Sequence, residues 1–395
     1  MALKTSNTAV AIAIQPVVDT FTTPTQPADL MPVSNCRLQI DSINIDNDEY
    51  TGSPFRNAAA VAGKKVTVSY NVKLRPPPGG TLPAANAFLL GRILQASKFT
   101  EVRTVTAIPA APEAGTSGSA TALTLGAGAT GTADLYKGMA ITLASMGATF
   151  KDRMTAIRSY TAGKVATFTE LFGSSVTGNY QIPSQLGYMR SITAADPILL
   201  SHSLWIDGYR VDLMNCRVTS LQFVIPTSTR DQAAFPEIQV TFDAMISATA
   251  DQTTPAVTSL GSVPFYKDGK GWMANTKVGI ANFTLDNGLS TENPPNPNKA
   301  DGSDAAELTG GVAGIDITTQ KYLKATMDPL ALADAQAQHA FFAQWGSTAG
   351  NMVQIVVPDF RFDYRNPDMG GALVMESGRL MIDAFDRSVC LNFPY

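Results

Sequence analysis

The residue types that carry most enzymatic chemistry are scarce in this chain. It contains two histidines, His202 and His339, and no serine in the G-x-S-x-G arrangement of an activated nucleophile. We expect His202 at the edge of a strand and His339 on the polar side of a helix, which are structural positions. We therefore predict no catalytic residue. A hydrolase that uses two carboxylates remains an alternative, because 33 acidic residues can supply such a pair by chance.

The cysteines and the clustered acids do not form a metal-binding pattern. Cys36, Cys216 and Cys390 lie far apart, so they indicate neither a metal knuckle nor a disulfide framework, and a reducing compartment is expected. The acidic run from Asp41 to Glu49 lacks the ligand alternation and the central glycine of an EF-hand loop. The sequence therefore predicts no metal ion.

A glycine-rich segment has the residue pattern of a nucleotide-binding motif but not its predicted structural context. Residues 126–131 read G-A-G-A-T-G, whereas a dinucleotide site needs a helix directly behind the glycines. A further strand is predicted at 139–143, which leaves no room for that helix. Gly63-Lys64-Lys65 likewise lacks the serine or threonine of a phosphate-binding loop. We predict a flexible turn at 126–131 and no bound cofactor.

Two long polar segments, 46–65 and 286–314, are the most unusual feature of the sequence. Loops of this length inside a compact β-unit are uncommon and are generally either functional or disordered. The short stretch 293–298, with its three prolines, favours a disordered surface excursion for that part. We predict that both segments contact neighbouring subunits, through Asp46, Asp48, Glu49, Tyr50, Phe55, Arg56, Asp286, Glu292, Asp301 and Asp304.

Composition narrows the class of protein further. The chain has 395 residues, of which 45% are hydrophobic and 16% charged, and its formal net charge is −4. That balance is enough for a large core and argues against a dedicated nucleic-acid binder, which carries a basic excess on one face. No apolar run reaches the length of a membrane span, and the short run 9–14 is a poor signal-peptide core.

Period-two alternation of apolar and polar residues dominates the sequence. It predicts strands at 66–74 and 238–242, among others, each with one face in a core. Helices are predicted over 84–97 and over 329–345, the second beginning with Asp328-Pro329, a capping residue before a proline. The chain is therefore predicted to be mainly β.

The order strand, long loop, strand, helix, strands occurs twice. We interpret this as two tandem β-sandwich or partial-barrel units, each with one flanking helix, the first of them interrupted by a small β-domain rich in Gly, Ala, Ser and Thr. The predicted boundaries are 1–34 for an N-terminal arm, 35–113 with 188–250 for the first unit, 114–187 for the inserted domain and 251–395 for the second unit.

Several stretches carry a resemblance to a known family. They are the arm 21–32, the strand and helix from Gly63 to Thr100, and the closing strands 207–218 and 236–242. With these stretches the chain resembles the tail tube, or major tail, proteins of long-tailed bacteriophages of the siphophage type. Residues 120–182 look like a small β-module of phage structural proteins. The sequence departs from the family pattern in that insertion and in a weaker match over 286–314.

The resemblance implies a structural virion protein without enzymatic activity. Chains would form rings of sixfold geometry, either as homotrimers with six units or as homohexamers, and the rings would stack into a tube in the virion tail, assembled in the bacterial host cytoplasm. The inserted domain would lie on the exterior. Implied partners are the tape measure protein, the tail terminator and distal tail proteins, and duplex DNA that passes through the lumen without specific binding; no membrane is involved.

Other classes of function remain as alternatives. A phage minor tail, tail-tip or receptor-binding protein would also be rich in β-structure, but it would not need the tandem unit. A secreted carbohydrate-active protein would be expected to carry aromatic platforms and a signal peptide, whereas this chain has three tryptophans.

Overall fold

The protein is mainly β, as the alternation predicts, with 49% of residues in strands and 6% in helices. The computed structural model describes residues 4, 7–48, 58–193, 196–258, 260–299 and 301–395. In those residues no helix is long and apolar enough to cross a membrane. Glu49, Tyr50, Phe55 and Arg56 lie outside the described residues.

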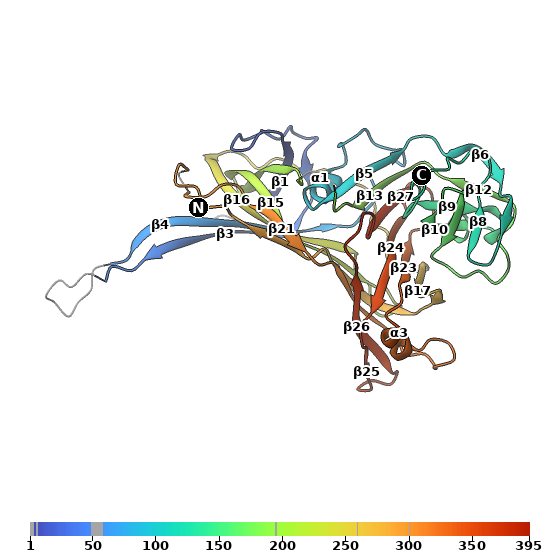
Figure 1. Cartoon of the computed structure of the whole chain (residues 1–395). Helices are drawn as coiled ribbons and strands as arrows, with labels where there is room; N and C mark the ends of the chain where they lie inside the picture. The colour runs from blue at the N-terminus through green and yellow to red at the C-terminus, as the bar shows by residue number, and fades with distance from the viewer. Residues whose placement is uncertain (1–3, 5–6, 49–57, 194–195, 259, 300) are drawn as a thin grey trace.

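A single antiparallel sheet, which we call the main sheet, runs through both halves of the chain and curves into a half-barrel (Figure 1). Each strand pairs with the next in the order β3 (Ser34–Ile45), β4 (Ala60–Lys73), β16 (Glu237–Asp251), β15 (Tyr209–Pro226), β19 (Ile280–Asp286), β22 (Gly314–Gln320) and β26 (Met375–Ile382). Residues from both predicted units thus share one sheet.

The alternation of each strand determines which face of the main sheet is buried. On β4, Val66, Val68, Tyr70 and Val72 are at most 4% exposed, whereas the intervening Thr67, Ser69 and Asn71 are partly accessible. The other strands of the main sheet repeat this pattern except β3, none of whose residues is buried, so one face of the sheet enters a common core. Burying one apolar face and leaving the other polar is the usual solution for an antiparallel sheet.

A second layer of strands covers the apolar face. On the first unit it consists of β1 (Thr8–Gln15), β2 (Leu30–Met31) and β14 (Leu199–Ile206). On the second unit the layer consists of β17 (Lys270–Met273), β18 (Thr276–Lys277), β23 (His339–Trp345), the first part of β24 (Val353–Phe362), β27 (Cys390–Pro394), β13 (Gln185–Arg190) and β5 (Phe99–Thr104). The end of β24, from Phe360, and β25 (Asn366–Asp368) pair with β26 and so continue the main sheet. Residues 8–15, predicted as part of an arm that precedes the fold, are therefore a strand within it.

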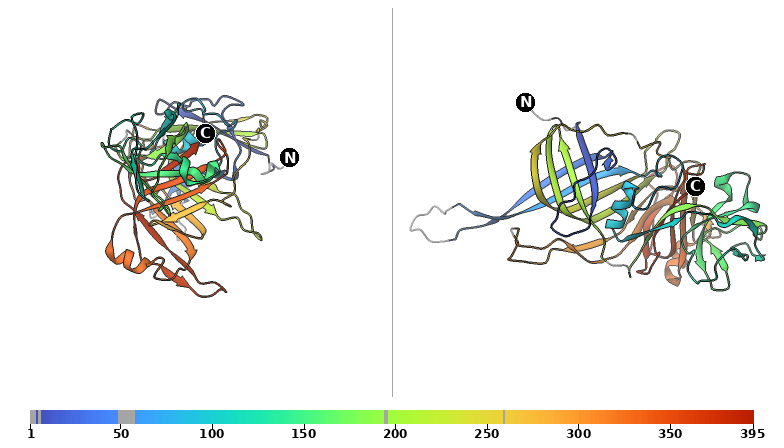
Figure 2. Two further views of the ribbon diagram at one scale, coloured as in Figure 1. Left: turned by 90° about the vertical axis from the view of Figure 1, so that its right-hand side faces the viewer. Right: turned by 90° about the horizontal axis from the view of Figure 1, so that it is seen from above.

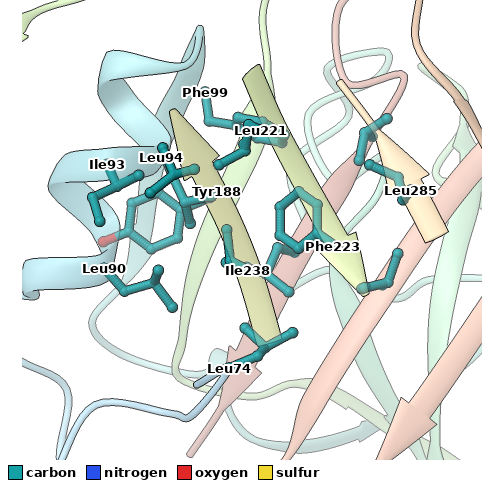
Figure 3. Packing of buried hydrophobic residues seen from close by; sticks show 14 of the residues in the cluster. Leu74, Leu90, Ile93, Leu94, Phe99, Tyr188, Leu221, Phe223, Ile238 and Leu285 are labelled. Carbon is teal, nitrogen blue, oxygen red and sulfur yellow. The ribbon is translucent and has the colours of Figure 1, made fainter. Parts of the chain in front are cut away.

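Helix α1 (Leu89–Ala96) packs on the core as predicted, although it begins five residues later than expected. Leu90, Ile93 and Leu94 point toward Tyr188 of β13 and toward the apolar face of the main sheet (Figure 3). A side chain at Gly91 would meet the Tyr188 ring, with a Cβ only 1.9 Å from Oη, so the glycine permits this close approach.

The predicted helix over 329–345 is wrong in its second half. Helix α3 spans only Pro329–Ala335 and begins with the Asp328 cap, which accepts a hydrogen bond from the Ala331 N–H. Gln336 adopts a left-handed conformation that ends it, and residues 339–345 form strand β23. This strand is buried on both faces except at His339. A strand without a polar face shows no period of two, so its apolar residues were compatible with a helix stripe.

The inserted β-domain has a sheet of its own, at the far end of the molecule from the β3–β4 hairpin (Figure 1). Its strands pair in the order β6 (Ile108–Ala114), β12 (Asn179–Ile182), β9 (Ala140–Leu143), β10 (Met154–Tyr160), β11 (Val165–Phe168), β8 (Ala122–Thr124) and β7 (Ser117–Gly118), beside helix α2 (Phe150–Arg153) and the turn η1 (Ala144–Met146). It therefore covers 108–182 rather than 114–187. Strand β13 instead lies between β5 and β27.

The same pairing order occurs in both halves. In the first it runs β1, β14, β15, β16, β4, β3, and in the second β17, β23, β24, β26, β22, β19. Helices α1 and α3 follow β4 and β22 respectively. Strand β19 is thus the counterpart of β3, and β24 is the counterpart of β15.

Candidate assembly surfaces

The face of the main sheet that no second layer covers is polar. In the described part of the chain its side chains include Thr67, Ser69, Asn71, Gln222, Gln239, Thr241, Asn282, Thr284, Asp316, Thr318, Ser377 and Arg379, none of which is buried. They occupy the strand positions that alternate with the core residues. Hydroxyl and amide groups dominate, although Val224 on β15 and Met381 on β26 also lie on this face, so the open face is mostly hydrophilic.

Two basic side chains on the open face are paired with neighbouring acids. Lys73 Nζ lies 3.0 Å from Glu237, whose other carboxylate oxygen accepts from Asn71. Arg379 lies 3.9 Å from Asp316 on the adjacent strand. Uncompensated lysines and arginines are what hold nucleic-acid phosphates. Lys73 and Arg379 are compensated on this face, whereas Arg37, opposite Ser69, is exposed and makes no ion pair within the described residues.

Strands β15 and β19 form a joint between the two units inside the chain. Five residues of β15, Gln222–Pro226, pair antiparallel with Asp286–Asn282 of β19. Phe223 faces Leu285 across the joint. One row of buried residues crosses it without a break: Val72, Ile238, Phe223, Leu285, Ile315, Leu380 and Phe362. The joint therefore continues both the hydrogen bonding and the core.

Strand β3 is a long edge strand with exposed apolar side chains. Among the described residues its only pairing partner is β4. Ile40, Ile43 and Ile45 are 52%, 54% and 61% exposed, and Val61 on β4, which pairs with Asn44, is 72% exposed. A twelve-residue edge strand of this kind is a template for pairing with another chain.

The other edge of the main sheet lies at β24 and β25. Beyond Phe360 these strands pair with β26 on one side, and the described residues offer no partner on the other. Tyr364, Met369 and Leu373 are 59%, 76% and 69% exposed near this edge. Both edges of the main sheet thus carry apolar surface.

Both long polar segments form hairpins. The β3–β4 hairpin extends well beyond the body of the protein, and a second hairpin, β20 (Leu289–Glu292) with β21 (Glu307–Gly311), continues β19 and β22 at the same end (Figures 1 and 2). Within 293–306, the Asn296 amide donates to Asp304 and Lys299 contacts Asp19, so this stretch is held by specific contacts.

The predicted contact residues fall into three groups. Asp46 and Asp48 are exposed where the β3–β4 hairpin leaves the described residues. Glu292 and Asp301 are exposed on the second hairpin, where Asp304 is half-buried, whereas Asp286 is tied to Gly288 and Gln222 at the base. The two hairpins meet at a groove of about 200 Å³ between Ile43, Lys64, Asp243, Asn293 and Asp301.

The exposed isoleucines of β3 were missed by sequence reasoning. The signal was present in the alternation itself: Leu38 and Ile40 have even numbers, whereas Ile43 and Ile45 have odd ones. A strand with apolar residues on both faces, outside any layered core, needs a partner.

The two histidines lie where acid–base chemistry is disfavoured. His202 is buried, its Nε2 is 2.9 Å from the Tyr70 hydroxyl, and burial lowers its pKa to about 3. His339 begins strand β23 rather than lying on a helix, and its pKa is lowered by burial and by Arg158. Both imidazoles are therefore neutral at pH 7.

The glycine-rich turn 126–131 binds a carboxylate of its own chain. Glu113 accepts hydrogen bonds from the N–H groups of Ala127 and Gly128, at 2.6 and 2.9 Å. The Tyr180 hydroxyl accepts from the Gly126 N–H. The donors that would bind a phosphate are thus occupied internally. Among the described residues, no three His, Cys, Asp or Glu side chains gather as a metal ion would require.

The inserted domain is fixed to the second unit by charge and by packing. Lys270 of β17 contacts Glu170 at 3.0 Å, and Lys137 and Arg158 both contact Asp359. Its core also includes Phe342, Val356 and Cys390 of the second unit.

No protein-family model matches the chain, and no curated protein matches it.

Proposed function

We propose that this chain is a structural virion protein that polymerises into stacked rings, which form the tail tube of a long-tailed phage and conduct DNA into the host. The observation that carries the proposal is the main sheet, which is continuous through two tandem units and has a polar, uncovered face. A sheet that already joins one unit to the next within the chain supports a ring built by repeating that joint.

The internal joint suggests how neighbouring chains meet. Strand β3 is the counterpart of β19, and the strand formed by β24 and β25 is the counterpart of β15. A second copy would add its β3 to the β24–β25 edge as β19 adds to β15, which leaves no edge unpaired in a closed ring. Each chain contributes two units, so three chains make a ring of six; six chains per ring is the alternative.

The open face would then line the lumen. Its hydroxyl and amide side chains are hydrophilic, and two of its cations, Lys73 and Arg379, are paired with acids. Phosphates bind proteins chiefly by releasing counterions at unpaired lysines and arginines. A lumen of this kind would let duplex DNA slide through. Tape measure protein would fill it before ejection, and terminator and distal tail proteins would cap its ends in the virion tail, after assembly in the bacterial cytoplasm.

Electron microscopy of the purified protein in negative stain tests this function. Hollow stacked rings with an open centre are expected, and end-on class averages would count the chains by their outer projections. Monomers that remain dispersed at high concentration would contradict self-assembly and favour a tail-tip or receptor-binding protein.

A further inference from the structure

A buried arginine at the end of β13 has no acidic partner among the described residues. Arg190 is 6% exposed, and within the described chain its guanidinium makes a single hydrogen bond, to the Ser388 hydroxyl at 3.4 Å. That distance is long for a hydrogen bond. A guanidinium carries five N–H donors and keeps its charge at neutral pH. Most of the Arg190 donors therefore lack an acceptor in the described part of the protein.

The other two arginines that are buried in the described chain have protein acceptors. Arg217 donates to two backbone carbonyls, and Arg365 donates to a threonine hydroxyl and to backbone carbonyls. Burial lowers the pKa of all three guanidinium groups, and nearby acids oppose this shift at Arg217 and Arg365. No acid of the described residues opposes it at Arg190. Because a buried charge without a counter-charge is costly, Arg190 calls for an anion from outside the chain.

Asp386 lies beside Arg190, but its carboxylate is already occupied. The Arg387 N–H donates to the Arg190 carbonyl, which places this loop against the end of β13. The Asp386 carboxylate accepts hydrogen bonds from the Ser191 hydroxyl at 2.9 Å and from the Ile192 N–H at 2.8 Å. Asp386 therefore fixes the segment that follows β13 and forms no ion pair with Arg190.

Arg190 lines a cleft of about 300 Å³ beside the base of the second hairpin. The charged residues that line this cleft in the described structure are two cations, Arg190 and Lys98, without an acid. Leu289 of β20 and Leu308 of β21 add apolar surface. The volume lies at the lower end of the range for small-molecule sites, which is about 300 to 1,000 Å³.

We propose that this cleft binds a small oxyanion, a carboxylate or a phosphate group, through Arg190 and Lys98. The planar guanidinium fork matches two oxygen atoms of either group, so such pairs are frequently bidentate. The two leucines suit a short carbon segment attached to the charged group. This site goes beyond the proposed function, since it requires neither rings nor a tube.

An anion in the cleft connects two parts of the fold. Arg190 belongs to the second layer, whereas Leu289 and Leu308 belong to the hairpin that continues β19 and β22 of the main sheet. A ligand that binds only the folded chain stabilises it increasingly as its concentration rises. We therefore expect the bound oxyanion to raise the melting temperature of the protein.

Isothermal titration calorimetry tests the site with inorganic phosphate and, separately, with succinate, in a buffer free of other oxyanions. Saturable binding of one anion per chain is expected for at least one of the two, and the comparison distinguishes phosphate from carboxylate. Arg190→Met is expected to weaken this binding at least tenfold, about 1.4 kcal/mol, and Lys98→Gln severalfold. Arg230→Gln, at an exposed arginine outside the cleft, is the control and is expected to leave the affinity unchanged.

Binding of neither anion, or equal affinities of wild type and Arg190→Met, would overturn the site and leave the proposed function untouched. Melting temperatures give a second measurement. Without oxyanions, Arg190→Met is expected to melt no lower than wild type, because it removes a buried unpaired charge, and neither anion should raise its melting temperature. A variant that melts well below wild type would show that the chain itself neutralises Arg190, which would also overturn the site.

Discussion

His202 illustrates how a titratable residue serves the core rather than chemistry. Its ring lies 4.6 Å from the Phe242 ring, edge to face, and contacts the Tyr70 hydroxyl. Burial lowers its pKa from 6.5 to about 3. In the unfolded chain the ordinary pKa returns, so between those pH values the unfolded state binds a proton that the folded state does not.

We therefore expect stability to fall as the pH is lowered from 6.5 toward 3. His202 contributes about 1.4 kcal/mol per pH unit in this window. Urea unfolding of wild type and of His202→Gln at several pH values measures it. The variant is expected to show a shallower slope by about that amount, and parallel slopes would contradict a neutral buried imidazole.

Glu170 is a buried carboxylate that depends on one cation. It is 2% exposed, burial raises its pKa, and Lys270 compensates by contacting both its oxygens while donating to the carbonyls of Asp152 and Met154. Removing one partner of a buried pair leaves an uncompensated charge.

Lys270→Met is thus expected to lower the free energy of unfolding by about 3 to 5 kcal/mol, measured by chemical denaturation. The matched control is Lys151→Met, which breaks a pair with the largely exposed Asp268 and is expected to cost less than about 1 kcal/mol. Equal effects of the two variants would show that the Lys270 pair is not buried in solution.

At the scale of elements, the joint between units predicts the contact between chains. Residues on the open face of β3 should meet residues on the open face of the β24–β25 strand, as Thr284 meets Val224 inside the chain. Side chains of paired strands that share a face are about 4.5 to 5.5 Å apart at Cβ, within reach of a disulfide.

We expect Gln39→Cys to form an intermolecular disulfide with one of three partners, Asp363→Cys, Asn366→Cys or Asp368→Cys, under oxidising conditions. Pro367→Cys is the control, because Pro367 pairs with Glu376 and so lies on the opposite face of β25 from Asn366 and Asp368; it is expected to remain unlinked. Covalent dimers and trimers on a non-reducing gel report the disulfide. The single variant Gln39→Cys is the control for disulfides that involve the native cysteines. Tubes without any of the three links would refute this mode of edge pairing while leaving assembly itself standing.

At the scale of the whole molecule, the inserted domain is part of the fold of the second unit. Phe342, Val356 and Cys390 are fully buried, because they pack against the core of the inserted domain. Thr104 pairs with Gln185, so a short turn could replace 106–183 without breaking the pairing of β5 with β13 in the second layer.

That deletion is nevertheless expected to destabilise the protein. Exposing Phe342 and Val356 costs about 1.5 to 3 kcal/mol for each side chain. Asp359 also loses both of its ion-pair partners, Lys137 and Arg158, which belong to the insert. A melting temperature measured by calorimetry should fall clearly below that of the full chain. An unchanged melting temperature would mean that the insert is a separable decoration.

Local pattern was sufficient to predict the mainly β class, the face of each half-buried strand and the start of helix α3. These features depend on neighbours in the chain: alternation selects a face, and Asp328-Pro329 supplies a cap and a preset φ. The repeated order of elements could also be predicted, because it is the order of the elements along the sequence.

Only the tertiary structure decided what depends on residues far apart. Strand β15 pairs with β14, β16 and β19, and no local pattern states that its end joins the second unit. The sequence of strand β23 was predicted to be helical, because a strand that is buried on both faces lacks the alternation of apolar and polar residues. The polar open face and the exposed edge of β3 arise from register, which brings distant residues together and which the hydrophobic pattern of one strand cannot specify alone.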